Sequence, residues 1–368
     1  MAITPVFSPL LGGGKLGRVL DVRERLSRQL EFQARSCLRL GSPLYEVLLD
    51  AATSDLLDGG AVYSILEDKV DDPDGSALAL RFMAAVHRLV LTGKAPELAE
   101  HYPSAGGAAG REGAAEAFLA VVEAHEDELR EDSRRPLQTN EVGRCSALVG
   151  GFLTVAERFQ LPLDVLELGA SAGFNLRWDH YLYEARGETW GDAGSPVRLC
   201  DYNTDNALPF HVTPEVASRR GCDPNPIDPL TEDGRVALLS FVWPDQAGRI
   251  RLLRGAMDVA ARVPVRVDRA PASSWLKETL DDRGPGVATV VFHSIVWQYM
   301  DEEEQAAVTA AIEAAGARAT SETPVAWLRM EPSEDMEHVE VRLQTWPGDD
   351  RLIATSGYHG TGVRWLGA

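Results

Sequence analysis

Residues 165–173 read Val165-Leu166-Glu167-Leu168-Gly169-Ala170-Ser171-Ala172-Gly173, an apolar strand that ends in an acid and continues into a turn of small residues. The glycines predict a nucleotide-type loop, in which backbone N–H groups and a helix N-terminus approach a ligand closely. The serine predicts a different chemistry, because the same turn spells G-x-S-x-G, the sharp turn that exposes a nucleophilic serine. The predicted function depends on which interpretation holds.

The composition is that of an ordinary globular protein that does not bind nucleic acid. The chain has 368 residues, of which 45% are hydrophobic and 25% are charged, so we expect two units, or one unit with a large extension. A formal net charge of −20 repels a phosphate backbone. We therefore expect a small-molecule partner and no nucleic acid.

Four cysteines are far apart in the sequence and form no C-x-x-C pair: Cys37, Cys145, Cys200 and Cys222. This spacing predicts buried free thiols, with neither a disulfide framework nor a metal site. No apolar run approaches the roughly 18 residues of a membrane span, and the N-terminus does not resemble a secretory signal. We expect a cytoplasmic protein without a membrane partner, of unknown oligomeric state.

The first part of the chain predicts an arm followed by helices. Residues 1–17 contain Gly12-Gly13-Gly14 and two prolines, which favours a flexible arm. Within residues 18–137 apolar residues recur at helical spacing, and Gly41-Ser42-Pro43, Asp72-Pro73-Asp74-Gly75 and residues 102–110 interrupt them. These residues predict an all-helical domain.

Residues 138–368 predict an α/β domain, and all eight tryptophans lie after residue 177. We expect a helix over residues 140–160 and apolar strands over residues 165–168, 236–242, 263–267, 287–292 and 325–330. Strands that alternate with helices indicate a Rossmann-like, doubly wound and mostly parallel sheet. Residues 339–343 and 352–356, joined by Pro347-Gly348-Asp349-Asp350, predict an antiparallel hairpin at the sheet edge.

The run Glu167-Leu168-Gly169-Ala170-Ser171-Ala172-Gly173 resembles the first motif of class I S-adenosylmethionine-dependent methyltransferases. That motif is an acid followed by G-x-G-x-G, and Ser171 stands here in place of the middle glycine. The resemblance covers residues 161–368. It implies S-adenosylmethionine as the cofactor and methyl transfer to an O or N atom of a small molecule.

Five further runs resemble an uncharacterised bacterial family, a domain of unknown function, over nearly the whole chain. They are Gln138-Thr139-Asn140-Glu141-Val142-Gly143-Arg144, Gly221-Cys222-Asp223-Pro224-Asn225-Pro226, Val242-Trp243-Pro244-Asp245-Gln246, Phe292-His293-Ser294-Ile295-Val296-Trp297-Gln298 and Trp327-Leu328-Arg329-Met330-Glu331-Pro332. This resemblance implies no substrate.

The methyltransferase resemblance implies where the cofactor binds. Glu167, Gly169, Ala170, Ser171 and Gly173 form its loop, and an acid at the end of the second strand holds the ribose hydroxyls. Asp223 is the candidate if an insertion spans residues 185–216, and Glu184 is the alternative. Three further candidates for cofactor binding are Asp268 at the end of the third strand, Asn140, and Arg144, whose guanidinium suits a carboxylate.

We expect the part of the site where the methyl group is transferred to lie at the end of the strand over residues 287–292. His293 follows that strand and suits a general base for an attacking O–H or N–H group, or else it caps the next helix. Trp243, Trp297 and Tyr299 suit stacking on a substrate or a sulfonium, but we expect at least two of them to fill the core. Gln138, Asn140, Glu141 and Arg144 suggest a lid over the cofactor or an interface between the domains.

Two other functions remain open. In a serine hydrolase of α/β type, Ser171 is the nucleophile, with Asp301 or Asp335 as the acid and His359 as the base. A non-catalytic ligand-binding protein is the third possibility, because a fold does not determine a function. An NAD-dependent dehydrogenase is disfavoured, because the G-x-G-x-x-G spacing is absent.

Overall fold

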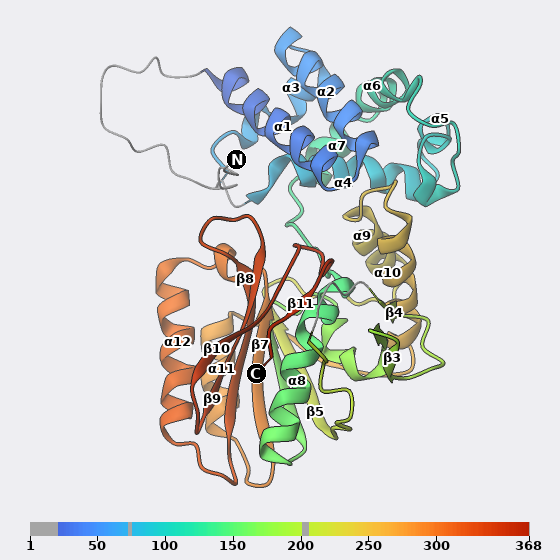
Figure 1. Cartoon of the computed structure of the whole chain (residues 1–368). Coiled ribbons are helices and arrows are strands. Elements are labelled where there is room, and N and C mark those ends of the chain that lie inside the picture. The colour runs from blue at the N-terminus through green and yellow to red at the C-terminus, as the bar shows by residue number, and fades with distance from the viewer. Residues whose placement is uncertain (1–20, 73–75, 201–205, 368) are drawn as a thin grey trace. The chain divides into compact units, whose positions relative to one another are not determined.

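A computed structural model describes residues 21–72, 76–200 and 206–367 and divides into two compact units (Figure 1). Of the described residues, those within 21–139 and 231–251 form the helical unit, and those within 140–230 and 252–367 form the sheet unit. The expected arm over residues 1–17 lies outside the described residues. The two units divide the sequence at residues 139–140, and residues 231–251 return to the helical unit.

The N-terminal part of the helical unit is helical, as predicted. Its elements are α1 (Val22–Arg39), α2 (Pro43–Asp58), α3 (Ala61–Leu66), η1 (Glu67–Lys69), α4 (Leu78–Leu91), α5 (Pro96–Ala99), η3 (Pro103–Ala105), α6 (Ala114–Ala124) and α7 (Glu126–Asp132). The predicted break at residues 41–43 is the start of α2, where Ser42 caps the helix and Pro43 takes its first position.

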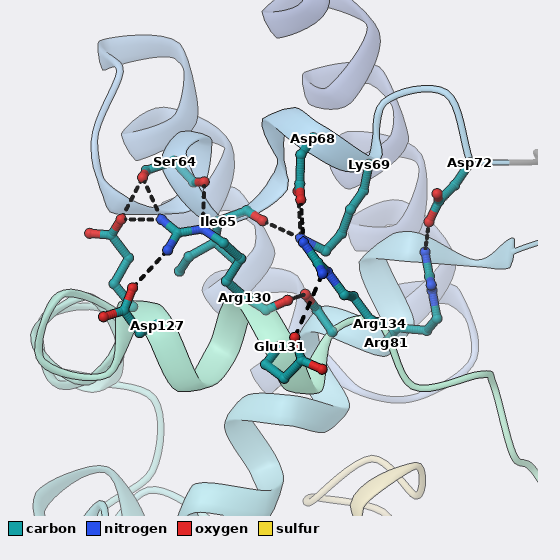
Figure 2. A network of polar contacts seen from close by, with 12 residues as sticks. Ser64, Ile65, Asp68, Lys69, Asp72, Arg81, Asp127, Arg130, Glu131 and Arg134 are labelled. Atoms are coloured by element: carbon teal, nitrogen blue, oxygen red, sulfur yellow. Dashed lines mark hydrogen bonds and ion pairs between the residues drawn. The ribbon is translucent and has the colours of Figure 1, made fainter.

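Charged side chains in the helical unit are paired with one another. Lys69 is 4% exposed, and its ammonium donates to the carbonyl of Ile65 and to Asp68 at 2.7 and 2.6 Å. Arg134 reaches the other oxygen of Asp68 at 2.7 Å, as Figure 2 shows. The ammonium of Lys69, and then Arg134, hold the pKa of Asp68 below its usual value. A buried ammonium is tolerated here because it is hydrogen-bonded.

The expected strand over residues 236–242 is wrong. These residues contribute to α9 (Glu232–Ser240), which is capped by the hydroxyl of Thr231 on the N–H of Gly234. A short apolar run does not distinguish a strand from a buried helix, whereas Thr231 followed by acids is a helix start. The next helix, α10 (Ala247–Ala260), begins in the helical unit and ends in the sheet unit.

The sheet unit is built on eight strands in the order β11-β10-β9-β8-β7-β1-β5-β6. They are β1 (Leu163–Leu168), β5 (Val216–Asp223), β6 (Arg266–Arg269), β7 (Ala288–Ser294), β8 (Val325–Pro332), β9 (Val339–Trp346), β10 (Asp350–Ser356) and β11 (Arg364–Trp365). The first five are joined by parallel pairing, and β8 to β11 by antiparallel pairing. The mostly parallel sheet and its C-terminal hairpin are therefore confirmed.

Helices cover both faces of the sheet, and alternation along each strand decides which side chain meets which helix. Leu166 and Trp327 share a core with α11 (Ala272–Asp281) and α12 (Glu302–Ala317). Phe292 points to the other face, where its ring meets Phe152 of α8 (Cys145–Phe159) at 5.1 Å. Both β1 and β7 are buried along their whole length, which explains their continuous apolar sequence.

An insertion separates β1 from β5, as the sequence suggested. It contains η5 (Asn175–His180) and a small sheet of β2 (Leu182–Ala185), β3 (Glu188–Gly191) and β4 (Arg198–Leu199) in the order β3-β2-β4. Among the described residues, no helix is long and apolar enough to cross a membrane.

Candidate functional site

The candidate site lies at the edge of the large sheet where the parallel strands end. Four side chains with acid or base chemistry stand at or near these ends: Glu167 on β1, Asp223 on β5, His293 on β7 and Glu331 on β8. The chain runs from β1 outward to β5 and β6 and then returns to β7 on the other side of β1. In open α/β sheets, ligands bind where the direction of the strand order reverses in this way.

The loop after β1 has the left-handed backbone that its glycines allow. Gly169, Ser171 and Gly173 have φ of +67°, +51° and +69°. A Cβ added at Gly169 would clash with Val296, and one at Gly173 would lie 2.8 Å from Val265 Cγ2. The glycines are therefore required by neighbouring side chains of the protein itself.

The N–H groups of this loop are largely engaged inside the protein. Ala170 donates to the carbonyl of Cys222 at 3.0 Å, Ser171 to Asp223 Oδ2 at 2.9 Å, and Gly173 to the carbonyl of Ala170 at 2.6 Å. The element that follows is the short 3₁₀ helix η5, kinked at Arg177. The expected helix N-terminus beside the ligand is therefore wrong. Three N–H groups of this loop are therefore not available to a phosphate group, and no α-helix dipole points at it.

Glu167 is a buried carboxyl with one free oxygen. It is 1% exposed, Asn175 Nδ2 donates to Oε1 at 3.3 Å, and Oε2 has no partner among the described residues. Burial, and next to it the charge of Asp223, raise the pKa of Glu167 well above its usual range, although the Asn175 hydrogen bond opposes the shift. A cation placed at Oε2 would offset this cost.

Asp223 ends the second parallel strand, and it also holds the loop. Its Oδ2 accepts from Ser171 N and its Oδ1 accepts from Asn225 N at 2.7 Å. Each carboxylate oxygen keeps a second acceptor position for a hydroxyl. Glu184 lies instead on β2 of the small sheet and is ion-paired with Arg198, so it does not end a strand of the large sheet.

Asp268 on β6 is held by neighbouring donors. Trp275 Nε1 donates to Oδ2 at 2.9 Å and Arg266 Nε donates to Oδ1 at 2.6 Å. Burial opposes the shift, but these two hydrogen bonds keep the pKa of Asp268 below its usual value. Among the described residues, no group of three or more His, Cys, Asp and Glu side chains is placed to hold a metal ion.

The residues before α8 brace the edge of the sheet. The expected helix begins only at Cys145, after η4 (Val142–Arg144), so Asn140 and Glu141 precede it. Asn140 Oδ1 accepts from Phe174 N at 3.0 Å. The guanidinium of Arg144 donates to the carbonyls of Ser294 and Tyr358 at 2.8 and 3.2 Å, joining the end of β7 to the loop after β10. Gln138 belongs to the helical unit.

His293 and Glu331 form a buried pair across β7 and β8. His293 is fully buried, and its Nδ1–H donates to Glu331 Oε1 at 2.6 Å. The same oxygen accepts from the N–H groups of Val296 and Trp297 at 3.2 and 3.4 Å. The hydrogen bond to Glu331 fixes the imidazole tautomer and leaves the lone pair on Nε2. This is the geometry of a base held by a carboxylate.

The expected aromatic residues lie in different places. Trp297, on η6 (Trp297–Tyr299), stacks on the His293 ring at 5.2 Å with planes 16° apart. Tyr299 is 46% exposed at the end of the same turn. Trp243 is buried in the helical unit at 6.4 Å from Tyr45, where it fills the core, as expected for at least two of the three aromatic residues.

The acid and base of the alternative hydrolase have other partners. His359 Nδ1 lies 3.2 Å from Glu141 Oε2. Asp301 caps α12 at the N–H of Glu304, and Asp335 accepts from the hydroxyl of Ser333. Ser171 has the positive φ of a strained elbow, but η5 follows it where an elbow leads into a helix.

Sequence reasoning missed three residues of the site: Asn175, Ile295 and Trp327. Trp327 lies on the same face of β8 as Glu331, a period-2 signal that was readable. Ile295 has φ of +49° directly after β7, a strained conformation for a β-branched residue that no sequence pattern reveals.

A cavity of about 440 Å³ lies elsewhere, beside the amino ends of β1 and β5. His211, Glu157 and Glu215 are among its lining residues, and His211 Nε2 lies 2.8 Å from Glu157 Oε1. The opposite edge of the sheet carries the buried acids and the histidine, so we assign the candidate site there.

The comparisons with known proteins identify the family. The family model described as "Uncharacterized protein conserved in bacteria (DUF2332)" matches residues 27–365. The chain belongs to this family. The match includes both units and every candidate site residue. Neither a curated protein nor a solved structure matches the chain.

Proposed function

We propose that the sheet unit is a Rossmann-like, doubly wound domain that binds S-adenosylmethionine at its carboxyl edge. Numbered along the chain, its parallel strands lie in the order third, second, first, fourth, fifth, which is the Rossmann order without its last strand. The loop after the first strand and the acid ending the second strand stand where such domains hold a nucleoside.

The observation that carries the proposal is the unpartnered oxygen of Glu167 next to a loop with engaged N–H groups. A pyrophosphate cofactor requires free N–H donors and is repelled by buried acids. S-adenosylmethionine has no phosphate and carries a sulfonium and an ammonium. A positively charged group at Glu167 Oε2 satisfies a carboxylate that is otherwise costly to bury.

The other residues fit the remaining parts of this cofactor. Asp223 offers its second acceptor positions to ribose hydroxyls. We assign the carboxylate of the cofactor to the guanidinium of Arg144, which also donates to the carbonyls of Ser294 and Tyr358. When bound, the cofactor supplies an electrophilic methyl group. On the adjacent strand, His293 Nε2 accepts the proton of an O–H or N–H acceptor, and Glu331 stabilises the imidazolium that results.

Calorimetric titration tests the proposal. We expect S-adenosylmethionine and S-adenosylhomocysteine to bind in the micromolar range and NAD to show no heat of binding. Binding of NAD alone would show that the loop accepts phosphates and would overturn the proposal. Absence of binding by all three would also overturn it and would redirect attention to Ser171.

A further inference from the structure

Several buried polar atoms without partners lie on neighbouring side chains of β7 and β8. One is Arg329 Nε, whose guanidinium lies 4.4 Å from the Trp327 ring and is ion-paired with Asp350. The other three are His293 Nε2, Glu331 Oε2 and Trp327 Nε1, and none of these has a hydrogen bond among the described residues. The His293 and Trp327 rings are 6.0 Å apart, and His293 is bonded to Glu331. Buried polar groups are nearly always satisfied, so three exceptions in one cluster indicate a missing polar molecule.

The rings of this cluster define the shape of that molecule. Trp297 stacks on His293, and its ring lies 5.7 Å from Trp327 at 54°. The two indole rings therefore flank the imidazole with flat apolar surfaces. A flat ring is the shape that stacks well in such surroundings.

The unsatisfied atoms define its hydrogen bonds. His293 Nε2 and Glu331 Oε2 are acceptors, because the imidazole proton is on Nδ1, whereas Trp327 Nε1 is a donor. The complementary ligand has two neighbouring O–H or N–H donors and one acceptor. A ring with two adjacent hydroxyl groups meets all three requirements while remaining uncharged.

The turn after β7 is strained at its buried start and exposed at its end. Ile295 has φ of +49°, a conformation that costs of order 1–3 kcal/mol for a non-glycine residue. The turn is held by Glu331 Oε1, which accepts from the N–H groups of Val296 and Trp297. Its outer residues Gln298 and Tyr299 are exposed. The exposed end of a turn moves more readily than the buried strands beside it.

We propose that this cluster is the acceptor-binding pocket and that its substrate class is a small planar aromatic compound with adjacent O–H or N–H groups. The inference rests on the proposed function, since it names the methyl acceptor of the same site. Glu331 positions the base through Oε1 and binds the second donor of the substrate through Oε2. Trp327 Nε1 fixes the orientation of the ring.

Spectrophotometric titration with 4-nitrocatechol, compared with 4-nitrophenol, tests this inference without any methyl transfer. We expect 4-nitrocatechol to bind and its absorbance to shift toward the ionised form, as its proton moves to His293 Nε2. Glu331→Gln should weaken binding roughly 10- to 100-fold, and Trp327→Phe, which keeps an aromatic ring but removes the indole N–H, by a smaller factor. The advantage of 4-nitrocatechol over 4-nitrophenol should disappear in Glu331→Gln, because the partner of the second hydroxyl is lost.

Gln298→Ala, on the exposed part of the same turn, is the matched control and should bind as the wild type does. Circular dichroism of each variant shows whether it is folded, and Trp327→Phe keeps the test valid if Glu331→Gln does not fold. Equal binding by wild type and both pocket variants, or no absorbance change up to millimolar probe, would mean that trapped water satisfies the three atoms. Titration with S-adenosylmethionine is independent of this outcome, so failure of the pocket and failure of the cofactor proposal are separable.

Discussion

The helical unit and the carboxyl edge of the large sheet both bury charged and polar side chains, but they satisfy them differently. In the helical unit the ammonium of Lys69 has two acceptors, and His87 has a partner on each ring nitrogen: the carbonyl of Ser240 at 3.1 Å and the hydroxyl of Ser104 at 2.7 Å. At the sheet edge, Glu167, His293 and Glu331 each keep one buried atom without a partner among the described residues.

The difference distinguishes buried polar groups that stabilise the fold from buried polar groups that bind a ligand. Buried groups that hold a fold together are paired within it, because each unpaired group costs free energy. Groups that await a ligand keep part of their bonding capacity open. Orphaned groups also occur in the helical unit: the buried hydroxyl of Tyr102 has no partner among the described residues, and N–H groups of Arg81 and Arg88 are unpaired, although both of these guanidiniums bind carboxylates.

The largest expected effect is that of Gly169→Ala, compared with Gly106→Ala in the helical unit. Both glycines have positive φ, but a Cβ at Gly169 would clash with Val296, whereas nothing lies within 4 Å of one at Gly106. We expect Gly169→Ala to destabilise the sheet unit by about 4 kcal/mol, from left-handed strain and overpacking together, and Gly106→Ala to cost about 1 kcal/mol. Hydrogen exchange resolved by peptide reports each unit separately.

Equal losses for the two glycine variants would contradict the close packing of the β1 loop against the turn after β7. A double variant that carries Val296→Ala together with Gly169→Ala should recover part of the lost stability, because the clashing side chain is shortened. Failure of that recovery would assign the whole effect to backbone strain.

The second prediction concerns acid stability of the helical unit. Burial lowers the pKa of His87 from 6.5 to about 4, so the folded state binds fewer protons than the unfolded state between these values. Stability is therefore lost as pH falls from about 6.5 to about 4, by about 3 kcal/mol in total. His87→Asn should flatten this dependence, as measured by peptide-resolved hydrogen exchange at several pH values. An unchanged slope in the variant would contradict a buried neutral His87.

The third prediction has the opposite pH dependence and concerns the sheet edge. The raised pKa of Glu167 means that the folded state holds a proton that the unfolded state releases, so stability falls as pH rises above about 4.5. Glu167→Gln should therefore stabilise the free sheet unit at neutral pH and have little effect near pH 4. A loss of stability at neutral pH would show that Glu167 is a structural residue, like those of the helical unit.

The smallest effect is expected for Arg134→Ala, in the network of Figure 2. The side chains of Arg134 and Asp68 are 54% and 42% exposed, so solvent screens their pairing, and the loss should not exceed about 1 kcal/mol. Thermal denaturation is a sufficient measurement. A loss of several kcal/mol would mean that surface pairing in this unit matters as much as packing.

Much of the sheet was predictable from the sequence, because strands that are buried on both faces of a parallel sheet have continuous apolar sequences. The segment 287–292 and the hairpin over 339–356 were found in this way. The structure of residues 236–242 was not predicted correctly, since an apolar run of this length also suits a helix. Here the N-cap at Thr231 marks the start of a helix.

Several residues of the site were predictable from the sequence, but their contacts were not. Ends of parallel strands meet at one edge, which placed Glu167, Asp223 and His293 together in outline. The bond between His293 and Glu331 depends on strand order, and the engagement of Ser171 N by Asp223 depends on the path of the loop. Neither is encoded in a local pattern, and neither is the return of residues 231–251 to the helical unit.

The most direct test of the central claim is a calorimetric titration of wild type and Glu167→Gln with S-adenosylmethionine. If the open oxygen of Glu167 receives a positively charged group, the wild type binds in the micromolar range and the variant, although folded and at least as stable at neutral pH, binds roughly 10-fold or more weakly. Equal affinity in the two proteins would contradict the claim that this buried carboxylate is kept unpaired for a cationic ligand.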